Sequence, residues 1–149
     1  MQAAPGLALL LLAAAAGAAP WPAAAQIRPF SCVGAEALEE AQVAVPFPHG
    51  SDRPDAAGES ALATALAWAL ESPRRNICVL GHALASEGGA QTGQRLAAAR
   101  ARAVAARLAA GGVDPARIRA EARVAGFTRS EAARPARGAT VILLPEEAP

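Results

Sequence analysis

Residues 76–113 read NICVLGHALASEGGAQTGQRLAAARARAVAARLAAGGV, and they decide the fold. They begin with a short apolar stretch, residues 76–80, whose β-branched side chains are typical of a buried strand. Pro73 prevents a preceding helix from running into this strand. Residues 92–110 are rich in Ala, Leu, Arg and Gln and predict a helix that ends at the glycine pair behind it. The glycine-rich loop between strand and helix is therefore held at both ends, which is a usual setting for a binding site.

Arg100 lies at the edge of the apolar face of this helix, between Leu96 and Val104 at helical spacing. Two interpretations of this position stay open. The guanidinium can reach over the loop and hold a carboxylate in a bidentate pair. Alternatively, the stem of the side chain covers the edge of the core while the charged end stays in water. Arg107 lies on the same stripe and has the same two interpretations.

Four other segments complete the predicted secondary structure. Residues 59–70 place leucines on one helical face and predict a second helix. Residues 43–48, 119–125 and 139–144 have the composition or alternation of strands. The resulting order, strand, helix, strand, helix, strand, strand, predicts an α+β fold. We expect a βαβαββ mixed sheet with two main helices packed on one face.

The chain divides into four parts by composition. Residues 1–25 have the apolar run and small-residue end of a secretory signal peptide, and the run is too short to cross a bilayer. We therefore expect a cleaved signal and no transmembrane span in the mature chain. Residues 26–42 are predicted to be a linker, residues 43–145 the domain, and residues 146–149 an acidic tail.

Charge and cysteine content restrict the kinds of partner. The 14 cations, all arginine, nearly balance the 13 carboxylates, which argues against nucleic-acid binding because that needs a clear basic excess. Cys32 and Cys78 either form a disulfide, which an exported chain permits, or remain two free thiols. Their spacing to His49 and His82 matches no metal site, so we expect neither a metal nor a cofactor.

Three motifs point to a family. They are Gly81-His82-Ala83 after the central strand, the helix pattern Leu96, Arg100-Ala101, Ala103-Val104 and Leu108, and the passage from Gly112-Val113 to Arg117-Ile118. Together they resemble the OmpA-like peptidoglycan-binding domain of bacterial envelope proteins. The resemblance covers residues 43–144 and implies the same βαβαββ fold.

The resemblance also implies a function and a location. Members of that family hold the diaminopimelate unit of a peptidoglycan stem peptide without a covalent bond, through an aspartate and an arginine. The arginine corresponds to Arg100, whereas the aspartate is absent because Leu84 and Ala85 follow Gly-His-Ala. Glu87 is the carboxylate that could replace it. The resemblance thus implies a periplasmic module, associated with the outer membrane or cell wall, with Arg100, His82, Glu87 and Thr92 as ligand-binding residues.

Two other functions remain open. Without the aspartate, the chain could keep the fold, lose peptidoglycan binding and act as an envelope protein-protein interaction module. An enzyme would need a catalytic trio, and His82, Ser86 and Glu87 are the nearest set of base, nucleophile and carboxylate. No nucleophile elbow or His-Glu-x-x-His helix occurs, so we expect no catalytic residues and no enzymatic activity.

Overall fold

The computed structural model describes residues 30–123 and 137–146, in which four strands form one mixed sheet of order β1-β4-β2-β3. The strands are β1 (Gln42–Pro46), β2 (Ile77–His82), β3 (Ile118–Ala122) and β4 (Gly138–Leu143). β4 is antiparallel to both β1 and β2, whereas β2 and β3 are parallel. The predicted signal peptide and residues 147–149 of the predicted tail lie outside the described residues.

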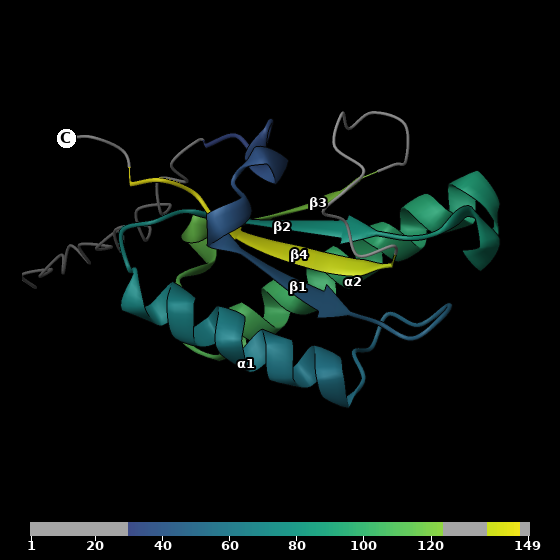
Figure 1. Cartoon of the computed structure of the whole chain (residues 1–149), viewed down its shortest axis with the longest axis horizontal. Coiled ribbons are helices and arrows are strands. Elements are labelled where there is room, and N and C mark those ends of the chain that lie inside the picture. The colour runs from purple at the N-terminus through teal and green to yellow at the C-terminus, as the bar shows by residue number, and fades with distance from the viewer. Residues whose placement is uncertain (1–29, 124–136, 147–149) are drawn as a thin grey trace, which may run out of the picture.

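Both main helices, α1 (Ala56–Glu71) and α2 (Gly89–Ala110), cover the same face of the sheet (Figure 1). The predicted α+β class and βαβαββ order are therefore confirmed. α2 starts three residues before the predicted helix, directly after Gly88, which has a φ of 122° that favours glycine. Among the described residues, no helix has the length and apolar character needed to span a membrane.

Polar side chains set both ends of α1. The Asp55 carboxylate accepts a hydrogen bond from the backbone N–H of Gly58 at 2.9 Å and so caps the first turn. At the other end, the guanidinium of Arg117 donates to the carbonyl oxygens of Ala69 and Ser72, where a helix leaves its last carbonyls without partners. Arg117 thereby ties the end of α1 to the start of β3.

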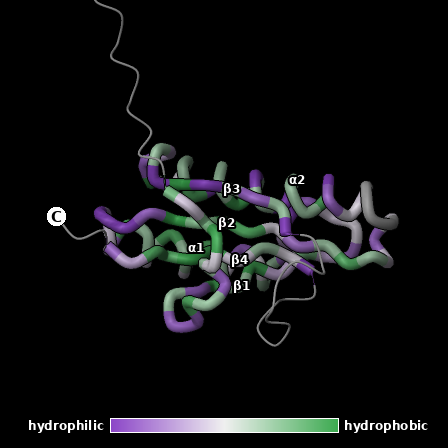
Figure 2. The backbone as a smooth tube through the Cα atoms, turned by 90° about the horizontal axis from the view of Figure 1, so that it is seen from above, coloured by the Kyte–Doolittle hydropathy of each residue, from purple (hydrophilic) through white to green (hydrophobic). Residues whose placement is uncertain are grey.

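The main core lies between the two helices and the sheet. All six residues of β2 are buried, whereas β3 forms an edge of the sheet and exposes Arg119. Figure 2 shows the corresponding difference in hydropathy, with β2 largely hydrophobic and β3 largely hydrophilic. Charged side chains on an edge strand discourage pairing with another chain. The core is built mainly from aliphatic side chains, among them Val45, Leu62, Ala65, Ile77, Val79, Val104, Leu108 and Val141, with Phe47 as its aromatic member.

The second face of the sheet is covered by the N-terminal arm, residues 30–41, which lies within the predicted linker. The arm contains two short turns, η1 (Ala35–Ala37) and η2 (Glu39–Ala41), and packs with Cys32 and Ala35 against a second apolar cluster of β2 and β4. A disulfide joins Cys32 to Cys78 of β2. The arm is thus part of the folded domain.

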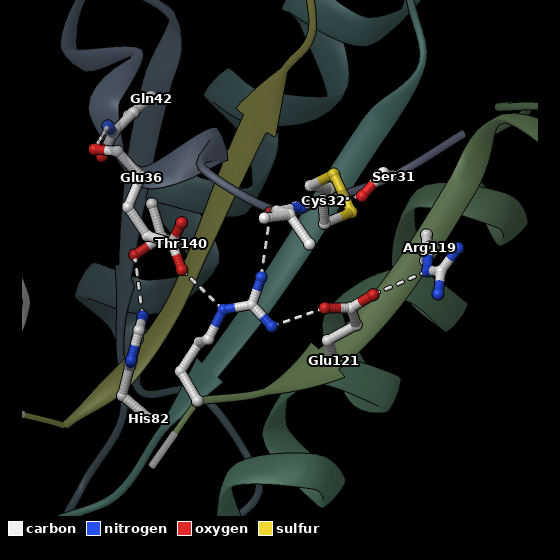
Figure 3. A network of polar contacts seen from close by, with 11 residues as sticks. Ser31, Cys32, Glu36, Gln42, His82, Arg119, Glu121 and Thr140 are labelled. Atoms are coloured by element: carbon white, nitrogen blue, oxygen red, sulfur yellow. Dashed lines mark hydrogen bonds and ion pairs between the residues drawn. A yellow bond between two sulfur atoms is a disulfide. The ribbon is translucent and has the colours of Figure 1, made fainter. Parts of the chain in front are cut away.

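A polar network strengthens this attachment (Figure 3). Arg123, directly after β3, contacts the carboxylates of Glu36 and Glu121 and donates to the carbonyl oxygen of Cys32 at 2.9 Å. Arg119 donates to the carbonyl oxygen of Phe30 at 2.8 Å. Arginines near the edge of the sheet therefore hold the arm in two places besides the disulfide.

Removing the disulfide tests its share in holding the arm. The bond closes a loop with a sequence separation of 46 residues, so we expect the double variant Cys32→Ala/Cys78→Ala to lose about 2–4 kcal/mol of unfolding free energy. Hydrogen exchange should become faster in residues 30–41 and stay slow in α2. Equal exchange in the arm of both proteins would contradict this role.

The approach of α2 to β2 depends on one missing side chain. A Cβ atom on Gly81 would lie only 1.8 Å from the carbonyl oxygen of Ala97, so the helix could not stay where it is. We expect Gly81→Ala to lower the unfolding free energy by about 3 kcal/mol, since backbone must move. Gly93→Ala is the matched control, because its Cβ would meet only the Leu84 carbonyl oxygen at 3.8 Å. Equal unfolding free energies of the two variants in chemical denaturation would show that the packing of α2 on β2 does not depend on Gly81.

Candidate functional site

Arg100 is the largest fully buried side chain of the described protein, with no exposed side-chain surface. It lies on the stripe of α2 that also buries Ala97, Ala101 and Val104. Ala97 and Ala101 lie against Gly81 of β2, and the Arg100 guanidinium reaches the backbone carbonyl of His82 at the end of that strand. The interpretation in which the charged end of Arg100 stays in water is therefore wrong.

All five N–H donors of the Arg100 guanidinium are used within the chain. An arginine has five such donors and no acceptor, so this set is complete. Three go to backbone carbonyl oxygens and two to one carboxylate: Nε to Ser51 at 2.8 Å, Nη1 to His82 at 2.9 Å, Nη2 to Pro48 at 3.0 Å, Nη1 to Glu87 Oε2 at 3.1 Å and Nη2 to Glu87 Oε1 at 2.7 Å. The guanidinium also lies over the ring of Phe47, 5.5 Å from its centroid.

The carboxylate of Glu87, the ion-pair partner of Arg100, is also held by several hydrogen bonds within the chain. It ends η3 (Ala85–Glu87), and its Oε1 also accepts from the backbone N–H of Gly50 while Oε2 accepts from that of Leu84, both at 2.8 Å. Its side chain has no exposed surface. The hydrogen bonds from Arg100 lower the pKa of Glu87 to about 2, helped by the two backbone N–H groups and opposed by burial. The carboxylate is therefore ionised at any physiological pH.

The pair joins four parts of the chain that are distant in sequence. Arg100 comes from α2, Glu87 from η3, the carbonyl of His82 from the end of β2, and Pro48 to Ser51 from the loop after β1. Sequence reasoning missed this last loop. Its signal is the turn-forming Pro-His-Gly-Ser run, which predicts a turn and does not indicate what the turn contacts.

The other two candidate residues lie apart from the pair. The side chain of His82 points to the opposite face of the sheet from Gly81, where its Nε2 lies 3.4 Å from Thr140 Oγ1. Thr92 is exposed near the start of α2. Of the four predicted ligand-binding residues, the structure brings together the side chains of Arg100 and Glu87 and only the backbone carbonyl of His82. In the trio His82, Ser86 and Glu87, the carboxylate is bonded to Arg100, the His82 ring lies against Thr140, and Ser86 is exposed.

A match to a family model identifies the architecture. The model described as "OmpA family" matches residues 46–139. The chain belongs to the OmpA family. The Arg100–Glu87 pair thus lies within the OmpA-family domain, with both residues inside the matched range.

Solved structures show the same fold at low sequence identity. A MotB-like protein from Desulfovibrio vulgaris is 19% identical over 70% of this chain and 69% of that chain, with a TM-score of 0.56. The periplasmic domain of Helicobacter pylori MotB is 17% identical over 72% and 73%, with a TM-score of 0.56. The OmpA-like domain of FopA1 from Francisella tularensis is 21% identical over 69% of both chains, with a TM-score of 0.53. No curated protein matches the chain.

The ion pair makes stability depend on pH in a defined direction. Since the pKa of Glu87 is about 2 in the folded protein and 4.5 without its partners, the pair contributes fully above about pH 4.5 and is lost as the pH falls to about 2. We expect wild type to exceed Glu87→Gln in unfolding free energy at pH 7, and this difference to shrink by roughly 3 kcal/mol at pH 2.

Urea denaturation at several pH values measures this difference. Glu59→Gln is the matched control, because Glu59 pairs with Arg107 at the surface and its removal should change stability little. A difference between wild type and Glu87→Gln that stays constant from pH 7 to pH 2 would show that the Glu87 carboxylate does not titrate as described.

Proposed function

We propose that this chain is a periplasmic, non-enzymatic interaction module of the OmpA family whose Arg100 no longer receives a ligand. The observation that carries the proposal is the complete use of the Arg100 donors by Glu87 and three backbone carbonyls. In effect, the carboxylate of Glu87 takes the position at the guanidinium that the family resemblance gives to a ligand carboxylate. The protein keeps the architecture and acts through other surfaces.

The energetics favour the internal carboxylate over an external one. A ligand carboxylate would have to displace Glu87, and breaking a buried ion pair typically costs about 3–5 kcal/mol. At 1.4 kcal/mol per factor of ten, this cost removes roughly two to nearly four powers of ten from the affinity. Displacement would also release the backbone N–H groups of Gly50 and Leu84, which Glu87 now satisfies.

The amine of a stem peptide would lack a partner as well. Leu84 stands where the family resemblance places an aspartate, and an apolar side chain cannot accept a hydrogen bond from an ammonium group. Leaving such a charge unpaired at a binding site costs several kcal/mol more. Both halves of a zwitterionic ligand therefore meet an unsuitable group.

The disulfide supports the proposed location. Cys32 and Cys78 are bonded, and such bonds persist in oxidising compartments such as the bacterial periplasm. The predicted signal peptide, residues 1–25, would deliver the chain there.

Binding of peptidoglycan stems through Arg100 is the second candidate function. It is favoured by the place of Arg100 on α2 within the matched family range, and it requires Glu87 to move out. The two candidate functions differ in one measurable respect. Only peptidoglycan binding through Arg100 predicts that a soluble stem peptide containing diaminopimelate competes with sacculi for the wild-type protein.

Cosedimentation with purified sacculi that contain diaminopimelate separates the two. We expect the wild-type protein to stay in the supernatant, and Glu87→Ala, which frees Arg100, to be retained more and to be released by soluble stem peptide. Glu59→Ala, an exposed glutamate paired with another arginine, is the control and should behave as wild type. Wild-type retention that the stem peptide abolishes would overturn the proposal.

A further inference from the structure

A hollow lies between the end of α1 and the adjacent ends of the sheet strands. Its volume is about 290 Å³. Trp68, Glu71 and Ser72 line it from α1 and its C-terminal end, and Glu40, Arg75 and Leu143 close it from the arm, the loop before β2, and β4. This volume is near the lower end of the range for small-molecule pockets, so it suits a single side chain better than a cofactor.

Trp68 leaves a large aromatic surface in water at this hollow, with 38% of its surface exposed. It shares a helical face with Glu71 and Ser72, which follow it by three and four residues. A partly exposed indole next to carboxylates is a favourable setting for a cation, because the face of the ring carries negative charge.

The two carboxylates at the hollow differ from five other glutamates among the described residues. Glu36, Glu59, Glu87, Glu121 and Glu146 each pair with an arginine. Neither Glu40 nor Glu71 has an ion-pair partner among residues 30–123 and 137–146. Both are exposed and both line the same hollow. They are therefore available to a positively charged group from outside.

The arginine at the hollow is engaged in holding the fold. Arg75 donates from Nε to the carbonyl oxygen of Leu144 at 2.7 Å and from Nη2 to that of Leu143 at 2.6 Å. Two carboxylates against this one guanidinium leave the lining with a net negative charge. The charge complements a cation and disfavours an anionic ligand.

We infer that this hollow binds a lysine or arginine side chain of a partner polypeptide, stacked on Trp68 and paired with Glu40 and Glu71. The inference rests on the proposed function, since it supplies the surface through which an interaction module would act. A basic side chain extends far enough from its own backbone to enter a hollow of this size, and its apolar stem can cover Trp68. One such contact is weak, so the rest of the interface must add affinity and specificity.

NMR titration of the purified protein with the peptide acetyl-Gly-Arg-Gly-amide tests the inference. The peptide that has citrulline in place of arginine is the neutral control of the same shape. We expect the arginine peptide to shift the Trp68 indole N–H signal and the backbone signals of Glu40 and Glu71, and the citrulline peptide to leave them unmoved. Added salt should weaken the binding, since both carboxylates are exposed.

Variants at the hollow have matched controls nearby. Trp68→Ala should weaken binding of the arginine peptide about fivefold, and Glu40→Gln/Glu71→Gln by a similar factor. Leu70→Ala and Glu39→Gln remove an exposed apolar side chain and an exposed carboxylate that do not line the hollow, and both should bind as wild type. The four variants change five positions, all of them exposed, so far-ultraviolet circular dichroism should show folded protein in each case.

Each other result overturns the inference. It fails if the arginine peptide shifts no signal at the hollow, if the citrulline peptide shifts the same signals, or if the control variants weaken binding as much as the others. It also fails if a stem peptide, whose diaminopimelate carries an amine, binds the hollow more tightly than the arginine peptide. The proposed function is tested separately, because it fails only if sacculi retain the wild-type protein and stem peptide releases it.

Discussion

The guanidinium of Arg100 is a charge without access to water, and the local structure is arranged to satisfy it. Transfer of an isolated ion into a protein interior costs several kcal/mol even after relaxation, so the fold must bring a countercharge and enough acceptors to the same point. Glu87 supplies the charge, and Pro48, Ser51 and His82 supply carbonyl oxygens. The loop after β1, the turn η3 and the end of β2 are thereby attached to α2. The loop after β1 and the turn before α2 depend on this interaction for their position.

Arginine plays a similar part elsewhere in the chain. Arg75 binds the end of β4, Arg117 the end of α1, and Arg123 the N-terminal arm, in each case through backbone carbonyl oxygens. A guanidinium can serve several carbonyls at once because its five donors lie in a rigid plane, which an ammonium group cannot match. This use of arginine suits a chain whose core is mainly aliphatic and has few aromatic side chains to add buried surface.

Local patterns predicted the helices and strands, whereas contacts between distant residues escaped prediction. The composition and glycine positions of residues 76–113 predict β2 and α2, and both elements lie within a few residues of the expected bounds. The partners of Arg100 are up to 52 residues away in sequence, and no periodicity specifies them. Glu87 was recognised as a candidate carboxylate, yet its burial depends on η3 and on the backbone turn at Gly88, which only the folded chain determines.

The charged groups that pair within the fold, and those that do not, also indicate where an interaction surface can lie. A group whose hydrogen bonds are complete gains nothing from a partner until those bonds break, so Arg100 and Glu87 contribute to the fold at the expense of recognition. Recognition then falls to groups that the fold leaves unpaired. Among the described residues, Glu40 and Glu71 beside Trp68 combine exposure, charge without a counterion, and aromatic surface in one hollow. Under the proposed function, the protein keeps the family's architecture while the hollow at the C-terminal end of α1, and not the buried pair on α2, makes the contact.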